Sequence, residues 1–115
     1  MTSWTRVCAW DDLMPDRGAA VLVDDAQIAL FRLTGQDQVH AVDHHDPFSG
    51  ANVMARGLVG SRAGHSTVAS PVFKQVFDLS TGQCLDDESV ALSTWTTRVV
   101  DGWVEVLLDD VGVST

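Results

Sequence analysis

Positive charge is scarce in this sequence. Seven Lys and Arg residues stand against sixteen Asp and Glu residues, which gives a formal net charge of -9. A surface field of that sign repels phosphate groups and anionic lipid headgroups. Nucleic acid and membrane surfaces are therefore excluded as expected partners.

Long apolar runs are also missing. No stretch approaches the ~20 apolar residues that a membrane span needs. The start, residues 1–6, lacks the basic and apolar segments of a secretion signal. We therefore expect a cytoplasmic protein. With 115 residues, of which 45% are apolar and 20% charged, the chain has the composition of one globular domain. We expect that domain over residues 1–108, with a frayed C-terminal tail over 109–115.

Motifs that carry chemistry by themselves are absent from the sequence. Cys8 and Cys84 lie far apart and form no CxxC or CxxH spacing, so nothing local indicates a zinc or redox pair. We interpret them as buried free thiols, with a disulfide as the alternative. The sequence also lacks the Gly-x-Ser-x-Gly motif of a nucleophile and the Gly-Lys-Ser/Thr of a phosphate loop. We expect no catalytic residues in this chain.

What the sequence does contain is a series of short aliphatic runs separated by turn residues. Residues 18–23 and 27–33 flank an Asp-Asp-Ala turn, and residues 39–43 follow after another turn. This spacing predicts an all-β fold, an antiparallel sandwich or barrel. One helical turn is expected near residues 11–14. The four tryptophans are interpreted as packing residues of the strands.

The C-terminal segment predicts a hairpin with a defined register. Asp101 and Gly102 suit the two positive-φ positions of a type I′ turn. The register then pairs Val100 with Trp103, Val99 with Val104 and Arg98 with Glu105. The face expected to be buried consists of Trp95, Thr97, Val99, Val104, Val106 and Leu108. By contrast, residues 43–64 lack alternation and are rich in Gly, which is typical of a functional irregular loop.

Two segments resemble a known pair of metal-binding loops. They are AVDHHDPFSGANV, residues 41–53, and VASPVFKQVFDLSTGQC, residues 68–84. Both are similar to the loops of Rieske iron-sulfur domains, in which the first loop carries Cys-x-His and the second Cys-x-x-His. The resemblance places Asp46 and Ser70 at the two cysteine positions. It places Phe48 and Phe73 at the two histidine positions.

These four residues do not suit a [2Fe-2S] cluster. The cluster needs two thiolates and two imidazoles, whereas carboxylate and hydroxyl oxygens are hard donors and a phenyl ring has no lone pair. We expect no cluster. We expect instead that both phenylalanines fill the vacated space and pack the loops together, each contributing roughly 1.5 to 3 kcal/mol. Asp46 is expected to form a turn through its carboxylate.

A narrower resemblance rests on three further pieces of sequence. Asp46-Pro47-Phe48, Ala69-Ser70-Pro71 and the stretch Met54-Ala55-Arg56-Gly57-Leu58 between them are similar to the small subunit of bacterial assimilatory NAD(P)H nitrite reductase. The resemblance implies a cluster-free Rieske-like β fold with no cofactor of its own. It also implies a large subunit as partner, with FAD, an iron-sulfur cluster and siroheme, which reduces nitrite to ammonia. The alternative is an interaction or electron-transfer module of another multicomponent oxidoreductase.

The resemblance also suggests where a partner binds. Rieske ferredoxins contact their partners at the loop tips, where this chain has His44, His45, Arg56 and Lys74. We take these four residues as candidate interface residues, with ordinary solvated loop positions as the alternative. His44 and His45 are neighbours, so in an extended chain their side chains point to opposite sides and cannot easily share an iron.

Overall fold

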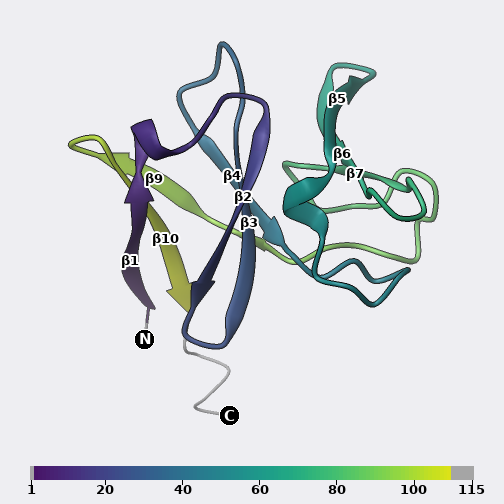
Figure 1. Ribbon diagram of the computed structural model, residues 1–115, viewed down its shortest axis with the longest axis horizontal. Helices are drawn as coiled ribbons and strands as arrows, with labels where there is room; N and C mark the ends of the chain where they lie inside the picture. The colour runs from purple at the N-terminus through teal and green to yellow at the C-terminus, as the bar shows by residue number, and fades with distance from the viewer. Residues whose placement is uncertain (1, 110–115) are drawn as a thin grey trace.

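The computed structural model describes residues 2–109, and this part of the chain folds into three antiparallel sheets (Figure 1). The first sheet has the order β1-β10-β9 and consists of β1 (Thr2–Ala9), β10 (Trp103–Asp109) and β9 (Thr97–Val100). The second, in the order β2-β3-β4-β8, consists of β2 (Arg17–Val23), β3 (Ala26–Arg32), β4 (Val39–Asp43) and β8 (Thr94–Trp95). The third consists of β5 (Leu58–Arg62), β6 (His65–Ala69) and β7 (Val76–Asp78). Two 3-10 turns complete the described part, η1 (Trp10–Asp12) and η2 (Met54–Arg56).

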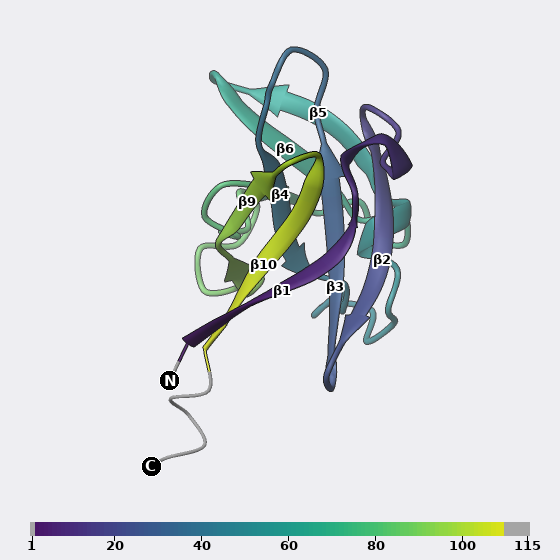
Figure 2. The ribbon, with the colours of Figure 1, turned by 90° about the vertical axis from the view of Figure 1, so that its left-hand side faces the viewer.

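The first two sheets are joined by one continuous segment of chain. β8 pairs with β4, and after Thr96 the same segment continues as β9, which pairs with β10. The hydroxyl of Thr97 donates a hydrogen bond of 2.5 Å to the carbonyl of Val39 at this corner. Figure 2 shows β1, β10 and β9 crossing in front of β3 and β4. The third sheet lies to one side of this pair, together with the loops.

Strands β3 and β4 are buried on both faces along most of their length, which explains why most of their residues are apolar. Ile28 and Leu30 of β3 face a core shared with the first sheet, where Val104 and Val106 are also buried. Ala29 and Phe31 point the other way, into a core shared with the third sheet. Successive side chains of a strand alternate between faces, so a strand between two cores carries apolar residues on both of its faces. β3 and β4 therefore form a rigid base for the loops.

The predicted C-terminal hairpin is confirmed in its turn and register. Asp101 and Gly102 have φ angles of 51° and 81°, and Arg98 lies opposite Glu105 with Nε 2.7 Å from Oε1. The predicted core face is only partly correct. Val104 and Val106 are fully buried, whereas Val99 is 36% exposed, because it lies on the edge strand close to the turn.

Further sequence expectations can be compared with the structure. The hairpin of β2 and β3 and the helical turn, which is η1, are confirmed. The predicted irregular region over 43–64 is too long, because β5 pairs with β6 and Gly64, at φ 83°, belongs to the turn between them. β10 includes Asp109, and the rest of the expected tail lies outside the described residues.

Arginine side chains cover three of the four tryptophans. The guanidinium carbon of Arg98 lies 4.1 Å from the ring centroid of Trp4, and the corresponding distances are 4.2 Å for Arg32 over Trp10 and 4.7 Å for Arg6 over Trp103. Contacts of this kind are cation-π interactions that stabilise a partly exposed ring. They fit the interpretation of the tryptophans as packing residues.

The two cysteines are free thiols in different cores. Cys84 is buried in the core next to the third sheet, and Cys8 is half-buried against the core next to the first sheet. Burial raises the pKa of the Cys8 thiol above its ordinary value, and the nearby Asp12 raises it further. No helix within residues 2–109 has the length and apolar character needed to cross a membrane.

Candidate functional site

Two loops meet beside the core of the third sheet. Loop 1, residues 44–53, follows β4, and loop 2, residues 70–75, connects β6 to β7. They are joined by a buried hydrogen bond of 2.5 Å, which the hydroxyl of Ser70 donates to Oδ2 of Asp46. The two residues at the cysteine positions of the resemblance are therefore in direct contact.

Asp46 organises loop 1 as well as joining it to loop 2. Its fully buried carboxylate accepts hydrogen bonds from the backbone N–H of Phe48 at 3.0 Å and from the hydroxyl of Ser49 at 2.9 Å. Burial raises the pKa of Asp46, but the hydrogen bonds from Ser70, Phe48 and Ser49 together outweigh burial and hold the pKa below its ordinary value. The predicted role of Asp46 in a turn is confirmed.

Ser70 also forms hydrogen bonds with the backbone of its own loop, loop 2. Its hydroxyl oxygen accepts a hydrogen bond of 3.2 Å from the N–H of Val72, while its own N–H donates to the carbonyl of Gln75 at 2.9 Å. One hydroxyl thus donates to loop 1 and accepts from loop 2. The conformations of the two loops are coupled through this group.

The two phenylalanines at the histidine positions behave differently. Phe48 is half-buried against the core, with its ring centroid 6.1 Å from that of Phe77, as expected of a packing residue. Phe73 is 59% exposed, so the prediction that its ring fills the space between the loops is wrong. Lys74 has a positive φ of 66° and ends a run of exposed residues that also includes Val72. The polar contact of Asp46 with Ser70 joins the loops instead, and the tip of loop 2 presents apolar surface.

The candidate interface residues divide into three exposed positions and one buried position. His45, Arg56 and Lys74 are exposed. His44 is only 8% exposed, and its Nδ1 accepts a hydrogen bond of 3.1 Å from the N–H of Ala55. Its expected place at a loop tip is therefore wrong, because this imidazole holds loop 1 against η2.

The electrostatics of the two neighbouring histidines follow from this geometry. Burial lowers the pKa of His44, and Arg56 lowers it further, while Asp43 opposes both. The imidazole of His45 lies in solvent, with Nδ1 3.1 Å from Oδ1 of Asn52. The expectation that the two side chains point to opposite sides is confirmed.

A tight turn over residues 78–82 follows β7, closed by a hydrogen bond of 2.7 Å from the N–H of Gly82 to the carbonyl of Asp78. Oδ1 of Asp78 accepts hydrogen bonds from the backbone of Ser80 at 2.7 Å and Thr81 at 3.4 Å. Gly82 closes the turn with a φ of 80°, and a Cβ at this position would overlap the carbonyl oxygen of Leu92. The turn lies within the second of the two segments that resemble Rieske loops, residues 68–84.

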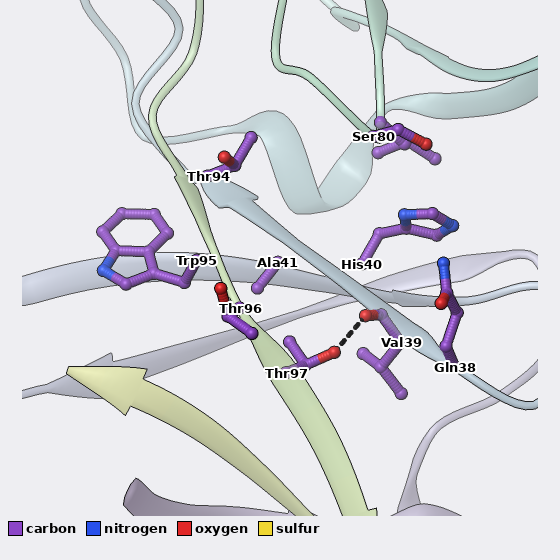
Figure 3. A pocket seen from close by; sticks show the side chains of 10 residues that line it. Gln38, Val39, His40, Ala41, Ser80, Thr94, Trp95, Thr96 and Thr97 are labelled. Atoms are coloured by element: carbon purple, nitrogen blue, oxygen red, sulfur yellow. Dashed lines mark hydrogen bonds between the residues drawn. The ribbon is translucent and has the colours of Figure 1, made fainter. Parts of the chain in front are cut away.

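Sequence reasoning missed a polar cavity of about 290 Å³ between β4, the turn at Ser80 and the segment of β8 and β9 (Figure 3). His40 lies in its wall, with Nε2 3.1 Å from Oε1 of Gln36. Burial lowers the pKa of His40, although Leu79 and Asp78 oppose this effect. The signal in the sequence was a polar residue, His40, within the otherwise apolar run of residues 39–42.

Comparison with known proteins places this architecture in a family. The sequence model of the Rieske-like [2Fe-2S] domain family matches residues 3–107 of this chain. The nitrite reductase (NADH) small subunit of Escherichia coli K12 is 41% identical over 106 residues, which cover 92% of this chain and 98% of that protein. The chain belongs to the nitrite reductase small-subunit family. The family and the Rieske-like all-β fold predicted from the sequence are both confirmed.

Solved structures support the placement of this small-subunit family member. A crystal structure from Mycobacterium tuberculosis, described as an NADH-dependent nitrite reductase small subunit, has a TM-score of 0.90 at 49% identity and covers 95% of this chain and 97% of its own. The ferredoxin of carbazole 1,9a-dioxygenase from Nocardioides aromaticivorans has a TM-score of 0.78 at 20% identity, covering 90% and 96%. The second match shows the fold alone.

One further relative is a larger protein. The nitrite reductase [NAD(P)H] large subunit of Klebsiella oxytoca is 38% identical to this small-subunit family member over 103 residues. The match covers 90% of this chain but 11% of the Klebsiella protein. A segment of the small-subunit type is therefore part of that larger polypeptide.

The iron-sulfur cluster implied by the Rieske fold does not fit the residues of this small-subunit family member. Asp46 and Ser70 offer oxygen atoms as metal ligands, and these oxygens are already hydrogen-bonded to each other. The rings of Phe48 and Phe73 offer no atom that can bind a metal. Within residues 2–109, no three His, Cys, Asp or Glu side chains are grouped so as to hold a metal ion. At the positions of the cluster ligands the two loops are joined by the hydrogen bond between Ser70 and Asp46.

Proposed function

We propose that this chain is the cofactor-free small subunit of an NAD(P)H-dependent nitrite reductase, which reduces nitrite to ammonia in nitrate assimilation. The observation that carries this proposal is the bond between Ser70 and Asp46, which joins the loops at the positions where a Rieske domain has thiolates. Similarity over nearly the whole chain to proteins named as nitrite reductase small subunits supports it. In this role the protein acts in the cytoplasm. It provides a binding surface for its partner and does not transfer electrons.

The partner in this proposal is the large subunit, which would carry FAD, an iron-sulfur cluster and siroheme. The Klebsiella large subunit supports the partnership, because it contains a segment similar to 90% of this chain. Two units that occur within one polypeptide are held at a high effective concentration, and separate chains need a docking surface to achieve the same result. The small subunit would stabilise or organise the large one.

The tip of loop 2 is the proposed point of contact. Val72 and Phe73 are exposed apolar side chains beside Lys74, and aromatic residues are enriched in the centres of protein interfaces. His45 and Arg56 are the other exposed candidates, from loop 1 and from η2. Because loop 2 is fixed to loop 1 through Ser70, the tip is held in place before it meets a partner.

Co-expression with the large subunit tests the proposal. We expect the two chains to purify as a complex with nitrite reductase activity, and we expect the isolated small chain to be colourless. The alternative, an electron-transfer module with unusual cluster ligation, requires iron and acid-labile sulfide in the freshly purified small chain, together with an iron-sulfur EPR signal. That result would overturn the proposal.

A further inference from the structure

The cationic side chains of this acidic protein differ in whether they already have a bonding partner within the protein. Arg6 and Arg98 both approach the carboxylate of Glu105, at 3.9 and 2.7 Å, and Arg62 lies 3.5 Å from Asp86. Arg32 donates to the carbonyls of Trp10 at 3.3 Å and Leu13 at 3.0 Å. Within residues 2–109, the structure shows no ion pair for the other three, Arg17, Arg56 and Lys74.

Two of these three cationic residues line one cleft. Arg17 begins β2 and Arg56 ends η2, and both border a cleft of about 490 Å³ between these elements and the start of β5. Within the lining of this cleft Gly18 packs directly against Ala55, because a Cβ on Gly18 would overlap the carbonyl oxygen of Ala55. A backbone contact this close fixes β2 and η2 against each other, and Arg17 and Arg56 are the chain neighbours of the two residues in contact.

The rest of the cleft is mainly aliphatic. Leu58, at 78% exposure, is the most exposed of the large apolar side chains in the described residues, and Val59 beside it is half-buried. The one carboxylate of the cleft, Asp16, accepts hydrogen bonds from the N–H of Thr34 at 2.9 Å and from its hydroxyl at 2.6 Å. Both oxygens of Asp16 are thus occupied by Thr34. Arg17 and Arg56, beside the exposed Leu58, therefore remain available to an incoming ligand.

This combination fits a peptide segment better than a small inorganic anion. A free phosphate or similar ion gains nothing from an exposed leucine, whereas an acidic segment of a protein offers carboxylates to the arginines and aliphatic groups to Leu58. The surface is also unusual for a chain with a net charge of -9, which otherwise repels acidic partners. Charge complementarity of this kind fixes the orientation of two docking proteins.

We propose that the cleft between β2, η2 and β5 binds an acidic, partly apolar segment of the nitrite reductase large subunit, with Arg17 and Arg56 as its carboxylate contacts and Leu58 as its apolar contact. The proposal rests on the proposed function, because it names the large subunit as the partner. It adds a second docking site on the flank of the molecule, formed by elements outside loop 2.

Charge reversal tests the proposal. The variants are Arg17→Glu and Arg56→Glu. The control is Arg62→Glu, which makes the same change of charge on an exposed side chain of β5 outside the cleft and also removes the ion pair with Asp86. Thermal unfolding first establishes that all three fold. We then measure binding to the purified large subunit at about 50 mM and about 500 mM salt, because screening separates electrostatic contributions.

We expect Arg17→Glu and Arg56→Glu each to weaken binding about tenfold at low salt, with a smaller salt dependence than the wild type shows, while Arg62→Glu stays within about twofold. The neutral variants Arg17→Gln and Arg56→Gln should lose less. Equal binding by wild type and both reversal variants would overturn this inference while leaving the proposed function intact. Failure of the wild type to bind would overturn both. Binding of inorganic phosphate to the isolated wild-type chain, lost in Arg17→Glu, would identify a small-anion site and also overturn the inference.

Discussion

The hydroxyl of Ser70 donates a hydrogen bond to the buried carboxylate of Asp46, across 24 residues of sequence and from one loop to the other. Both side chains are buried, so the bond is shielded from water. A hydrogen bond to a charged group is worth about 1.5 to 3 kcal/mol. The positions that hold iron through thiolates in a Rieske domain here hold the two loops together directly.

Ser70→Ala is expected to lower the free energy of unfolding by about 1.5 to 3 kcal/mol, because it removes a donor from a buried carboxylate and an acceptor from the N–H of Val72. Urea denaturation followed by tryptophan fluorescence measures the change. Ser61→Ala, at an exposed position of β5, is the matched control and should change stability by less than about 0.5 kcal/mol. Equal effects of the two substitutions would contradict the role of Ser70.

Asp46 also predicts a dependence of stability on acid. Its pKa is lower in the folded chain than in the unfolded chain, so the unfolded state binds more protons as the pH falls. The contribution of Asp46 is complete above the unfolded pKa of about 3.9 and is lost as the pH falls through the folded pKa. Asp46→Asn should therefore destabilise the protein most at neutral pH, and its difference from wild type should shrink in acid. A difference that stays constant with pH, in denaturation series from about pH 6 downward, would argue against this linkage.

Local patterns predicted the strands well and the loops poorly, for a physical reason. The register of the hairpin around Asp101 and Gly102 depends on neighbouring residues, and the sequence contains that information. The exposure of Phe73 depends on what fills the space beside it, which is decided by a contact between residues 24 positions apart. Hydrophobicity alone favoured burial of that ring. The contact of Gly18 with Ala55 also joins residues far apart in the sequence, so local patterns do not predict it.

His44→Asn tests the buried imidazole. Asn places an oxygen where Nδ1 accepts from Ala55, but it cannot be protonated. Because burial lowers the pKa of His44, the unfolded chain takes up protons first, and wild-type stability should fall as the pH drops below the unfolded value of about 6.5. His40 acts in the same direction, so His40→Gln is the companion variant. Each variant should flatten the curve of unfolding free energy between about pH 6.5 and 5. A slope in His44→Asn equal to that of wild type would refute the prediction.

Gly82→Ala is expected to be severely destabilising. An alanine there adopts a left-handed conformation at a cost of about 1 to 2 kcal/mol, and its methyl group also overlaps the carbonyl oxygen of Leu92. Gly35→Ala separates the two costs, because Gly35 has a φ of 81° but open space around it. Thermal unfolding should therefore show a larger loss for Gly82→Ala than for Gly35→Ala. Similar losses would mean that the backbone near Leu92 moves aside.

Substitution of Phe48 should affect mainly the stability of the fold, whereas substitution of Phe73 should affect mainly binding to the large subunit. Phe48→Ala removes a ring packed on Phe77 and is expected to cost about 2 kcal/mol of stability, below the range for a fully buried ring. Phe73→Ala removes an exposed ring, so its stability should change by less than about 0.5 kcal/mol, while its affinity for the large subunit should fall about tenfold. Leu22→Ala, which truncates an exposed side chain of β2, is the control for binding and should leave affinity unchanged. Titration calorimetry and urea denaturation measure the two quantities on the same samples. If Phe73→Ala binds as tightly as wild type, loop 2 is not the docking tip, and its exposed apolar residues need another explanation.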